Sequence, residues 1–464
     1  MISVDVPIPA ADGGPLPADV FLPARLPAPV VVVRTPYGTP PLWPEAAVLA
    51  EAGAAVVLQD LRGRYRSPGE FVPGADESRD GRAALDWIAA RDWSDGTALL
   101  YGTAYEAYAA WCAADHPSVR GVVSRQPWPG GPPAMDDELW WRTELGTGRH
   151  LRPGLYDLAL ARDPDLRGVL ADPASWPVAP GPWPPTPSTW KAQARRALTR
   201  VRGAHVPSLH LGSWYCGSAT TTLRQAALAR DATVVMGGWA SPLTHRLSPE
   251  CAIEVPDGDD PRDLALSFLA ALAAKQDPRK AVGDRLLTLG AGRWDDTSPL
   301  PPPAPALDPA PLRPATARST LRHDPADPYP SLPHSADLSV IGGRDDVVRL
   351  AAHPPVRWYG AARLRCRVTA DAPVELVATV VHERPGGARV RLCDGTAPIS
   401  AGTQDATVRL APVAVDLPEG HVLHVELTAG RHPRHRAPGR ALTLTVELDP
   451  GTALLVPRPR KESP

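Results

Sequence analysis

One short segment of the chain has the pattern of a turn that carries the nucleophile in many enzymes. Residues 97–101 (TALLY) predict a buried strand, Gly102 follows at once, and a helical stretch then runs to residue 114. Such a turn projects its central side chain over the end of a sheet, where a serine can attack a carbonyl. The central residue here is Ala104, and a methyl group cannot act as a nucleophile. The segment therefore predicts the turn without its usual chemistry.

The elements around this turn alternate between strand and helix. Apolar runs predict buried strands at residues 29–33, 54–59, 97–101 and 119–123, with helices at 42–52 and 77–90. The same alternation resumes at residues 208–212, 232–237 and 261–275. This order predicts a mostly parallel sheet, in which sites form at the C-terminal ends of the strands.

Two changes of pattern predict the domain organisation. Residues 130–203 contain helical segments at 136–145 and 188–201 and a Pro/Trp-rich stretch at 173–189, and we interpret them as a lid. After residue 283 a proline-rich connection at 299–314 leads to short alternating strands. These strands predict an all-β sandwich or jelly roll. The predicted domains are an α/β core (1–129 and 204–282), a helical lid insertion (130–203), and a linker with a C-terminal β domain (283–464).

Several ordered motifs make the whole chain, apart from the lid, resemble the CocE/NonD hydrolase family. This is the cocaine-esterase and X-Pro dipeptidyl-peptidase group of α/β-hydrolases. The motifs include R-T-P-Y (34–37), Q-D-L-R-G (59–63), G-T-A-Y (102–105), S-W-Y-C-G (213–217), G-G-W (237–239), D-P-A-D-P (324–328) and L-C-D-G (392–395). The resemblance implies an α/β-hydrolase domain with a helical lid, followed by a C-terminal jelly-roll domain.

The resemblance also implies where a Ser-Asp-His triad should stand, and all three positions differ. Ala104 replaces the serine, Cys216 replaces the acid, and counting from Gly237 places Ser241 where the histidine is expected. Acyl transfer needs a nucleophile, a base that takes its proton and an acid that orients the base. The serine-hydrolase mechanism is therefore predicted to be absent.

The oxyanion hole of the family is implied to remain, at Tyr37 and at the backbone N–H of Tyr105. Two such donors can hold a carbonyl oxygen that gains negative charge, which is what proton abstraction next to a carbonyl needs. Glu106, Cys216 and His245 are the candidate groups that would move the proton.

Each candidate also has an ordinary structural interpretation. Tyr37 suits packing, Glu106 suits the N-terminal turn of a helix, Cys216 suits a small buried apolar site, and His245 suits the surface. Asp60 and Arg62 favour a structural ion pair. Five tryptophans are expected to line a substrate pocket or the core: Trp128, Trp140, Trp141, Trp214 and Trp239.

Composition limits the partners. The net charge of −2 gives no basic surface for nucleic acid, and the longest nearly apolar run (264–274) is too short to span a membrane. The five cysteines form no C-x-x-C pair, so no metal site or cofactor is predicted, and no signal peptide pattern opens the sequence. We expect a cytoplasmic protein that binds a small molecule or peptide.

Two functions from different classes fit these observations, and a third fits less well. The first is a cofactor-independent enzyme of the epimerase, isomerase or cyclase type, acting on a peptide or natural-product intermediate. The second is a pseudo-hydrolase that binds such a ligand without turnover. The third is residual esterase or peptidase activity through Thr103, Ser213 or Ser241.

Overall fold

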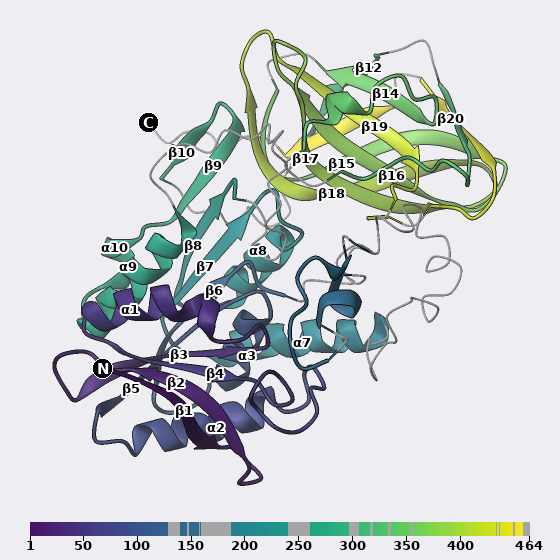
Figure 1. The fold of residues 1–464 in the computed structure, drawn as a ribbon. Coiled ribbons are helices and arrows are strands. Elements are labelled where there is room, and N and C mark those ends of the chain that lie inside the picture. Colours follow the sequence, from purple (N-terminus) through teal and green to yellow (C-terminus); the bar gives the residue numbers. More distant parts are fainter. Residues whose placement is uncertain are drawn as a thin grey trace.

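The computed structural model describes most of the chain as an α/β domain followed by an antiparallel β domain (Figure 1). The described residues are 1–128, 140–145, 148–156, 158, 187–239, 260–296, 306–315, 319–332, 336–352, 356–432, 434–435, 437–448 and 451–457. Ser241, His245 and most of the predicted lid lie outside them. Within the lid the structure describes a π-helical turn, Trp141–Leu145, and helix α7, Pro187–Gly203.

The α/β domain is built on a sheet whose strands follow the order β1-β2-β4-β3-β5-β6-β7-β8-β9. Their bounds are β1 Ile2–Pro9, β2 Pro15–Phe21, β3 Ala28–Thr35, β4 Ala55–Asp60, β5 Ser94–Thr103, β6 Val119–Arg125, β7 Ser208–Ser213, β8 Ala232–Gly237 and β9 Arg285–Gly290. Neighbours from β4 to β9 pair in parallel, which confirms the predicted parallel sheet. The antiparallel strands β1 and β2 were not predicted. Because β9 pairs with β8, this sheet continues past the predicted boundary at residue 282.

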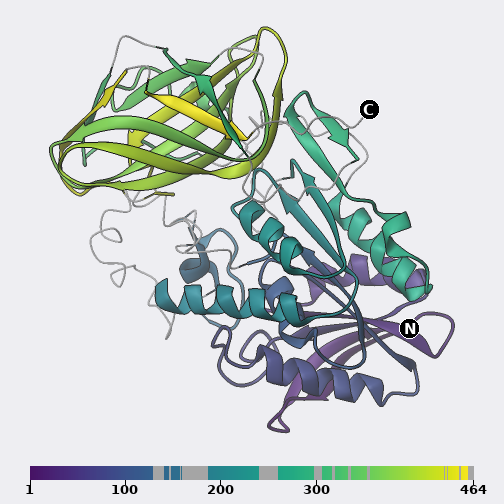
Figure 2. The ribbon, with the colours of Figure 1, turned by 180° about the vertical axis from the view of Figure 1, so that it is seen from behind.

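Helices cover both faces of this sheet, as the two opposite views show (Figures 1 and 2). The alternation within β3 explains why, because Val30 and Val32 enter one apolar core while Val31 and Val33 enter the other. The first core is closed by α2 (Glu77–Ala89), α3 (Tyr105–Ala113) and α7. The second is closed by α1 (Trp43–Glu51) and α9 (Pro261–Ala273). The remaining helices in the described part of the chain are α8 (Ala219–Leu228) and α10 (Pro278–Ala281), with a 3-10 turn at Pro40–Leu42.

The β domain is a sandwich of two antiparallel sheets, as predicted. One sheet contains β11 Leu307–Pro311, β13 Thr320–His323, β15 Val356–Ala370, β18 Gly402–Leu417, β20 Leu442–Glu447 and β21 Ala453–Pro457. The other contains β12 Arg313–Pro314, β14 Val347–Ala352, β16 Val374–Glu383, β17 Arg389–Ile399 and β19 Val422–Ala429. β10, Arg293–Asp295, pairs with β9, and a 3-10 turn spans Leu338–Val340. Leu364 and Val408 of one sheet share a core with Val380 and Val425 of the other.

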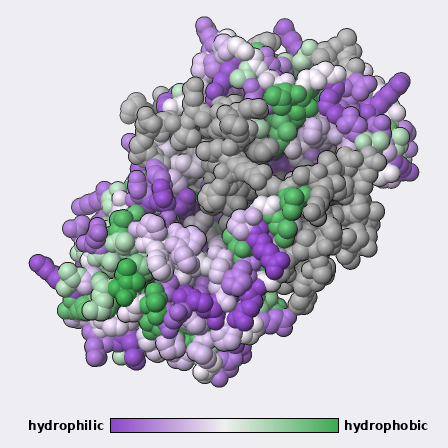
Figure 3. All heavy atoms as spheres, in the orientation of Figure 1, coloured by the Kyte–Doolittle hydropathy of each residue, from purple (hydrophilic) through white to green (hydrophobic). Residues whose placement is uncertain are grey.

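The two domains are joined through their sheets as well as through the chain. β9 pairs in parallel with β18 at Leu289 and Val415, so one continuous sheet crosses the boundary. None of the described helices is long and apolar enough to cross a membrane. On the face drawn in Figure 3, hydrophilic residues cover much of the described surface and the hydrophobic patches are separate.

Candidate active site

The turn after β5 has the strained geometry that places a nucleophile in this kind of fold. Ala104 has φ 53° and ψ −115°, a conformation that a non-glycine residue rarely adopts. Gly102 allows the tight turn because it has no Cβ. A Cβ at this position would lie 2.3 Å from the carbonyl carbon of Glu106. The end of β6 holds the turn, since Ala104 N donates to Arg125 O (3.0 Å) and Trp128 N donates to Ala104 O (3.2 Å). The turn predicted from sequence is therefore present, with an alanine at its centre.

The two predicted oxyanion donors meet beside this turn. The Tyr105 N–H donates to the Tyr37 hydroxyl oxygen at 3.3 Å. A ligand oxygen that contacts both groups would therefore take the place of this bond. Burial raises the pKa of Tyr37 well above its ordinary value, and the nearby Glu106 charge adds to this. The phenol therefore keeps its proton at neutral pH. Tyr105 is itself fixed, since its hydroxyl donates to Glu77 and accepts from Gly74 N (2.8 Å).

Glu106 lies under the turn, with only 5% of its surface exposed. Its Oε1 accepts from the Thr35 hydroxyl (2.7 Å) and its Oε2 accepts from Thr103 N (3.0 Å). Thr35 Oγ1 also accepts from Tyr37 N (3.1 Å), so the carboxyl group is linked to the loop that carries the phenol. Burial raises the pKa of Glu106 to about 7, although its hydrogen bonds act in the opposite direction. Thr35 was not singled out from the sequence, although it lies within the R-T-P-Y motif.

Three of the five predicted pocket tryptophans gather at this turn. The rings of Trp128 and Trp141 stack with centroids 4.6 Å apart, and both lie within 5.5 Å of the Tyr105 ring. Trp140 packs edge-on against Trp141 at 6.4 Å, and Tyr37 lies 6.4 Å from the same ring. These rings enclose the oxyanion donors in aromatic surroundings.

The other two tryptophans lie elsewhere. Trp214 donates from Nε1 to Leu287 O (2.7 Å) and packs against Tyr359 of the β domain. Trp239 belongs to the core under α9 and packs against Trp294. Sequence position after a strand end did not distinguish these two rings from those that gather at the turn.

The remaining candidates divide between described and undescribed residues. Cys216 is half-buried after β7, and its Sγ accepts from the Ser218 hydroxyl at 3.2 Å. Ser213 is fully buried, and its hydroxyl donates to Trp239 O and accepts from Tyr215 N (3.2 Å). Ser241 and His245, the expected base position and its neighbour, lie outside the described residues.

The R-G-R-Y-R segment after β4 supplies three arginines, of which only Arg62 was predicted to form an ion pair. Asp60 and Arg62 do not pair with each other as expected. Arg62 binds Asp80 (2.9 Å), and Asp60 binds Arg66 (2.9 Å), because the loop turns the two side chains toward different elements. In the sequence Arg64 lies between Arg62 and Arg66. Its side chain contacts the loop before Tyr37, where its Nε donates to Pro36 O (2.9 Å).

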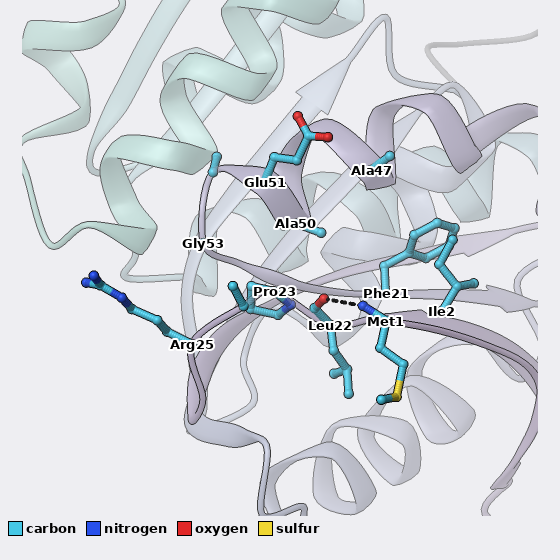
Figure 4. A pocket seen from close by; sticks show the side chains of 12 residues that line it. Met1, Ile2, Phe21, Leu22, Pro23, Arg25, Ala47, Ala50, Glu51 and Gly53 are labelled. Carbon is cyan, nitrogen blue, oxygen red and sulfur yellow. Dashed lines mark hydrogen bonds between the residues drawn. The ribbon is translucent and has the colours of Figure 1, made fainter.

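A separate cavity of about 570 Å³ lies at the opposite end of the sheet (Figure 4). Phe21, which lines it, pairs with Val56 at the start of β4, whereas Ala104 follows the C-terminal end of β5. Ala50, Glu51 and Leu22 also line it. This cavity therefore has no part in the site around Tyr37.

The sheet order, the strained strand-to-helix turn and the added β sandwich define an α/β-hydrolase with a C-terminal β domain. The family model of X-Pro dipeptidyl-peptidase (S15 family) matches residues 12–143. A cocaine esterase of Rhodococcus sp. (strain MB1 Bresler) is 28% identical, and the alignment covers 94% of this chain and 92% of the esterase. These matches confirm the predicted resemblance to CocE/NonD hydrolases.

Solved structures show the same fold over the full chain. An aminopeptidase from the marine sediment archaeon Thaumarchaeota archaeon aligns with a TM-score of 0.79 at 18% identity, covering 98% of this chain and 96% of the other. A CocE/NonD family hydrolase from Staphylococcus aureus aligns with a TM-score of 0.64 at 15% identity, covering 98% and 93%. The fold of the whole chain is thus similar to that of these two enzymes.

Proposed function

We propose that this protein binds a carbonyl compound at Tyr37 and Tyr105 and transfers a proton next to the carbonyl, without hydrolysing an ester or amide. The substrate class is a peptide-like or natural-product-like acyl compound, and no cofactor takes part. The 3.3 Å approach of the Tyr37 hydroxyl to the Tyr105 nitrogen carries the proposal. Two donors at that spacing suit an oxyanion, and they remain beside a turn that has no nucleophile.

The conformation of Ala104 also supports the proposal. A residue in such a sparsely populated backbone region costs about 1–3 kcal/mol and persists only where its surroundings hold it. The alanine side chain has no catalytic group that would have to point toward a substrate. The strained turn does, however, hold the Tyr105 N–H next to the Tyr37 hydroxyl, where a ligand oxygen could replace the bond between them. Retention of this geometry favours a site that still binds a carbonyl oxygen.

Glu106 is the described group best suited to accept the proton. Each of its oxygens accepts one hydrogen bond and keeps a second lone pair, and its pKa of about 7 leaves it partly ionised at neutral pH. In the proposed step the carboxylate takes a proton from the carbon next to the carbonyl. The electron pair of that C–H bond forms the enolate, whose oxygen Tyr37 and Tyr105 hold. Return of the proton to carbon gives the epimer or isomer and regenerates the carboxylate.

A binding protein without turnover is the second candidate. The hydrogen bond from Ser218 to the Cys216 sulfur favours it, because a thiol in that position neither orients nor accepts a proton as a carboxylate would. In this case Tyr37 and Tyr105 hold a ligand carbonyl and no bond changes.

Deuterium exchange distinguishes these functions. The protein is incubated in D₂O with methyl phenylacetate, phenylacetamide and the N-acetylcysteamine thioester of phenylacetate, and α-deuterium is followed by NMR. We expect exchange, at a rate that falls about 100-fold or more in Tyr37→Phe, because one oxyanion donor is lost. Binding without exchange would instead identify the binding protein.

Two controls complete the experiment. Tyr329→Phe removes a phenol in the β domain, whose hydroxyl donates to Glu426, and should leave the exchange rate unchanged. Hydrolysis of p-nitrophenyl butyrate is followed in parallel. Rapid release of p-nitrophenol, with an acyl group left on a protein side chain, would contradict the proposal.

A further inference from the structure

Arg64 is a buried cation next to the candidate active site, with 1% of its surface exposed. Its Nε donates to Pro36 O (2.9 Å), and its NH1 donates to Leu145 O (2.8 Å) and Gly148 O. All three acceptors are backbone carbonyls. The side chain therefore joins the loop before Tyr37 to the described base of the lid, without neutralising its own charge.

The neighbouring arginines show what Arg64 lacks. Arg62 binds the carboxylates of Asp80 and Asp12, and Arg66 binds those of Asp19 and Asp60, with distances of 2.7 to 2.9 Å. Among the residues that the structure describes, no carboxylate pairs with Arg64. Its NH2 group is buried and has no hydrogen-bond partner there.

Burying an unpaired charge lowers the stability of a protein, so a buried arginine is expected to have an anionic partner. Moving an ion from water into the protein interior is unfavourable, and buried guanidinium groups are normally paired with an anion. Burial lowers the pKa of Arg64 to about 10, which still leaves it protonated at neutral pH. The site therefore holds a positive charge and two free N–H bonds on NH2.

The surroundings of Arg64 connect it to the oxyanion donors. Its guanidinium carbon lies 5.5 Å from the centre of the Phe71 ring, and that ring packs edge-on against Tyr105 at 5.7 Å. The Arg64 charge also acts on the Tyr37 phenol, where it opposes the rise in pKa that burial causes. The cation, the phenol and the Tyr105 ring thus share one aromatic cluster.

We infer that Arg64 recognises a carboxylate of the ligand, so that the preferred ligand is an acyl compound that also carries a negatively charged carboxylate. The NH2 group would donate to one carboxylate oxygen while Tyr37 and Tyr105 hold the carbonyl oxygen. This inference rests on the proposed function for the position of the carbonyl, but it concerns binding and requires no turnover.

Paired ligands test the inference in the intact protein. The monomethyl esters of phenylmalonic and phenylsuccinic acid are compared with their neutral amides, in which the carboxylate becomes a primary amide. Dissociation constants are measured by calorimetry at pH 7.5. We expect the acids to bind about 10- to 100-fold more tightly than the amides, as is usual for a hydrogen bond to a charged group. Equal affinities, or binding of neither pair, overturn the inference.

Variants separate recognition from a purely structural role. Arg64→Gln should abolish the preference for the acid, whereas Arg64→Lys keeps the charge and should retain most of the preference. Arg79→Gln removes an exposed arginine that pairs with Asp76, and should change neither the dissociation constant of the acid nor that of the amide. If Arg64→Gln only lowers the melting temperature while the wild-type protein does not distinguish acid from amide, Arg64 is a structural clamp alone.

The result is independent of the exchange experiment. Exchange on neutral esters without any preference for acids would remove the role of Arg64 and leave proton transfer intact. Preference for the acids without exchange would support the role of Arg64 and remove proton transfer.

Discussion

The hydroxyl of Tyr37 lies 3.3 Å from the backbone nitrogen of Tyr105, although the two residues are 68 positions apart. The contact joins the loop after β3 to the first residue of α3. It depends on the strained conformation of Ala104 and on the hydrogen bonds that Glu106 accepts from Thr35 and Thr103. Variants of these supports should therefore alter the site in predictable ways.

Gly102→Ala should destabilise the protein, because the added methyl group would lie 2.3 Å from backbone atoms of α3. Forcing an atom into a packed site costs about 1–3 kcal/mol, and backbone atoms cannot move aside easily. Urea unfolding measures the change. Gly203→Ala is the matched control, since its Cβ would meet nothing within 4 Å and alanine favours the helix end. Equal stability of the two variants would contradict the described turn.

The ionisation of Glu106 should make stability depend on pH. Its pKa rises from 4.5 to about 7 on folding, so between these values the native state binds more protons than the unfolded state. Stability therefore falls as pH rises through this window, by up to about 3 kcal/mol at about 1.4 kcal/mol per pKa unit.

Glu106→Gln isolates this contribution, because an amide does not titrate. The unfolding free energy of the wild type minus that of this variant should be more positive at pH 5 than at pH 8, because only the wild type loses stability as pH rises. Glu419→Gln, at an exposed turn, should give the same difference at both pH values. A difference for Glu106→Gln that does not vary with pH would show that the carboxyl group ionises normally.

Ala104→Ser alone should not create an esterase. A serine at this turn needs a base and an orienting acid, and the family resemblance implies that Cys216 and Ser241 occupy those places. The triple variant with Cys216→Asp and Ser241→His should hydrolyse p-nitrophenyl butyrate measurably faster than the single variant. Appreciable turnover by Ala104→Ser by itself would mean that another residue serves as the base.

Trp141 and Trp214 should respond differently to substitution. Trp141→Phe should weaken binding of the phenylacetyl probes, because its ring stacks on Trp128 next to the oxyanion donors. Trp214→Phe should leave ligand affinity unchanged and lower stability, by about 1 kcal/mol for the lost hydrogen bond to Leu287 in addition to lost packing. Calorimetry and thermal unfolding of both variants measure the two effects, and a reversal of the pattern would contradict this assignment.

The sequence was sufficient for most of the architecture. The valine-rich runs of β3 and β4, the glycine after β5 and the alternating strands beyond residue 356 all predict elements that the structure contains. Local patterns suffice there because buried parallel strands and half-buried antiparallel strands have distinct periodicities. β1 and β2 were missed, since both contain prolines, β1 is mostly exposed and β2 carries the charged Asp19.

The sequence also determined what the site lacks. Ala104 stands where a nucleophile is expected, whatever the tertiary structure, because no conformation gives a methyl group a lone pair. The family resemblance implied Tyr37 and Tyr105 as the oxyanion donors, and Glu106 was identified from its position beside the predicted turn.

Only the tertiary structure decided how these residues are arranged. It brought Tyr37 to the Tyr105 N–H and placed Trp128 and Trp141 at the site but Trp214 at the domain boundary. It also left Arg64, between two paired arginines, with no carboxylate partner among the described residues. Residues distant in sequence become partners only when the sheet and helices pack, and the burial that follows sets their charge and pKa. For this reason the absent nucleophile could be inferred from the sequence, whereas the unpaired cation could not.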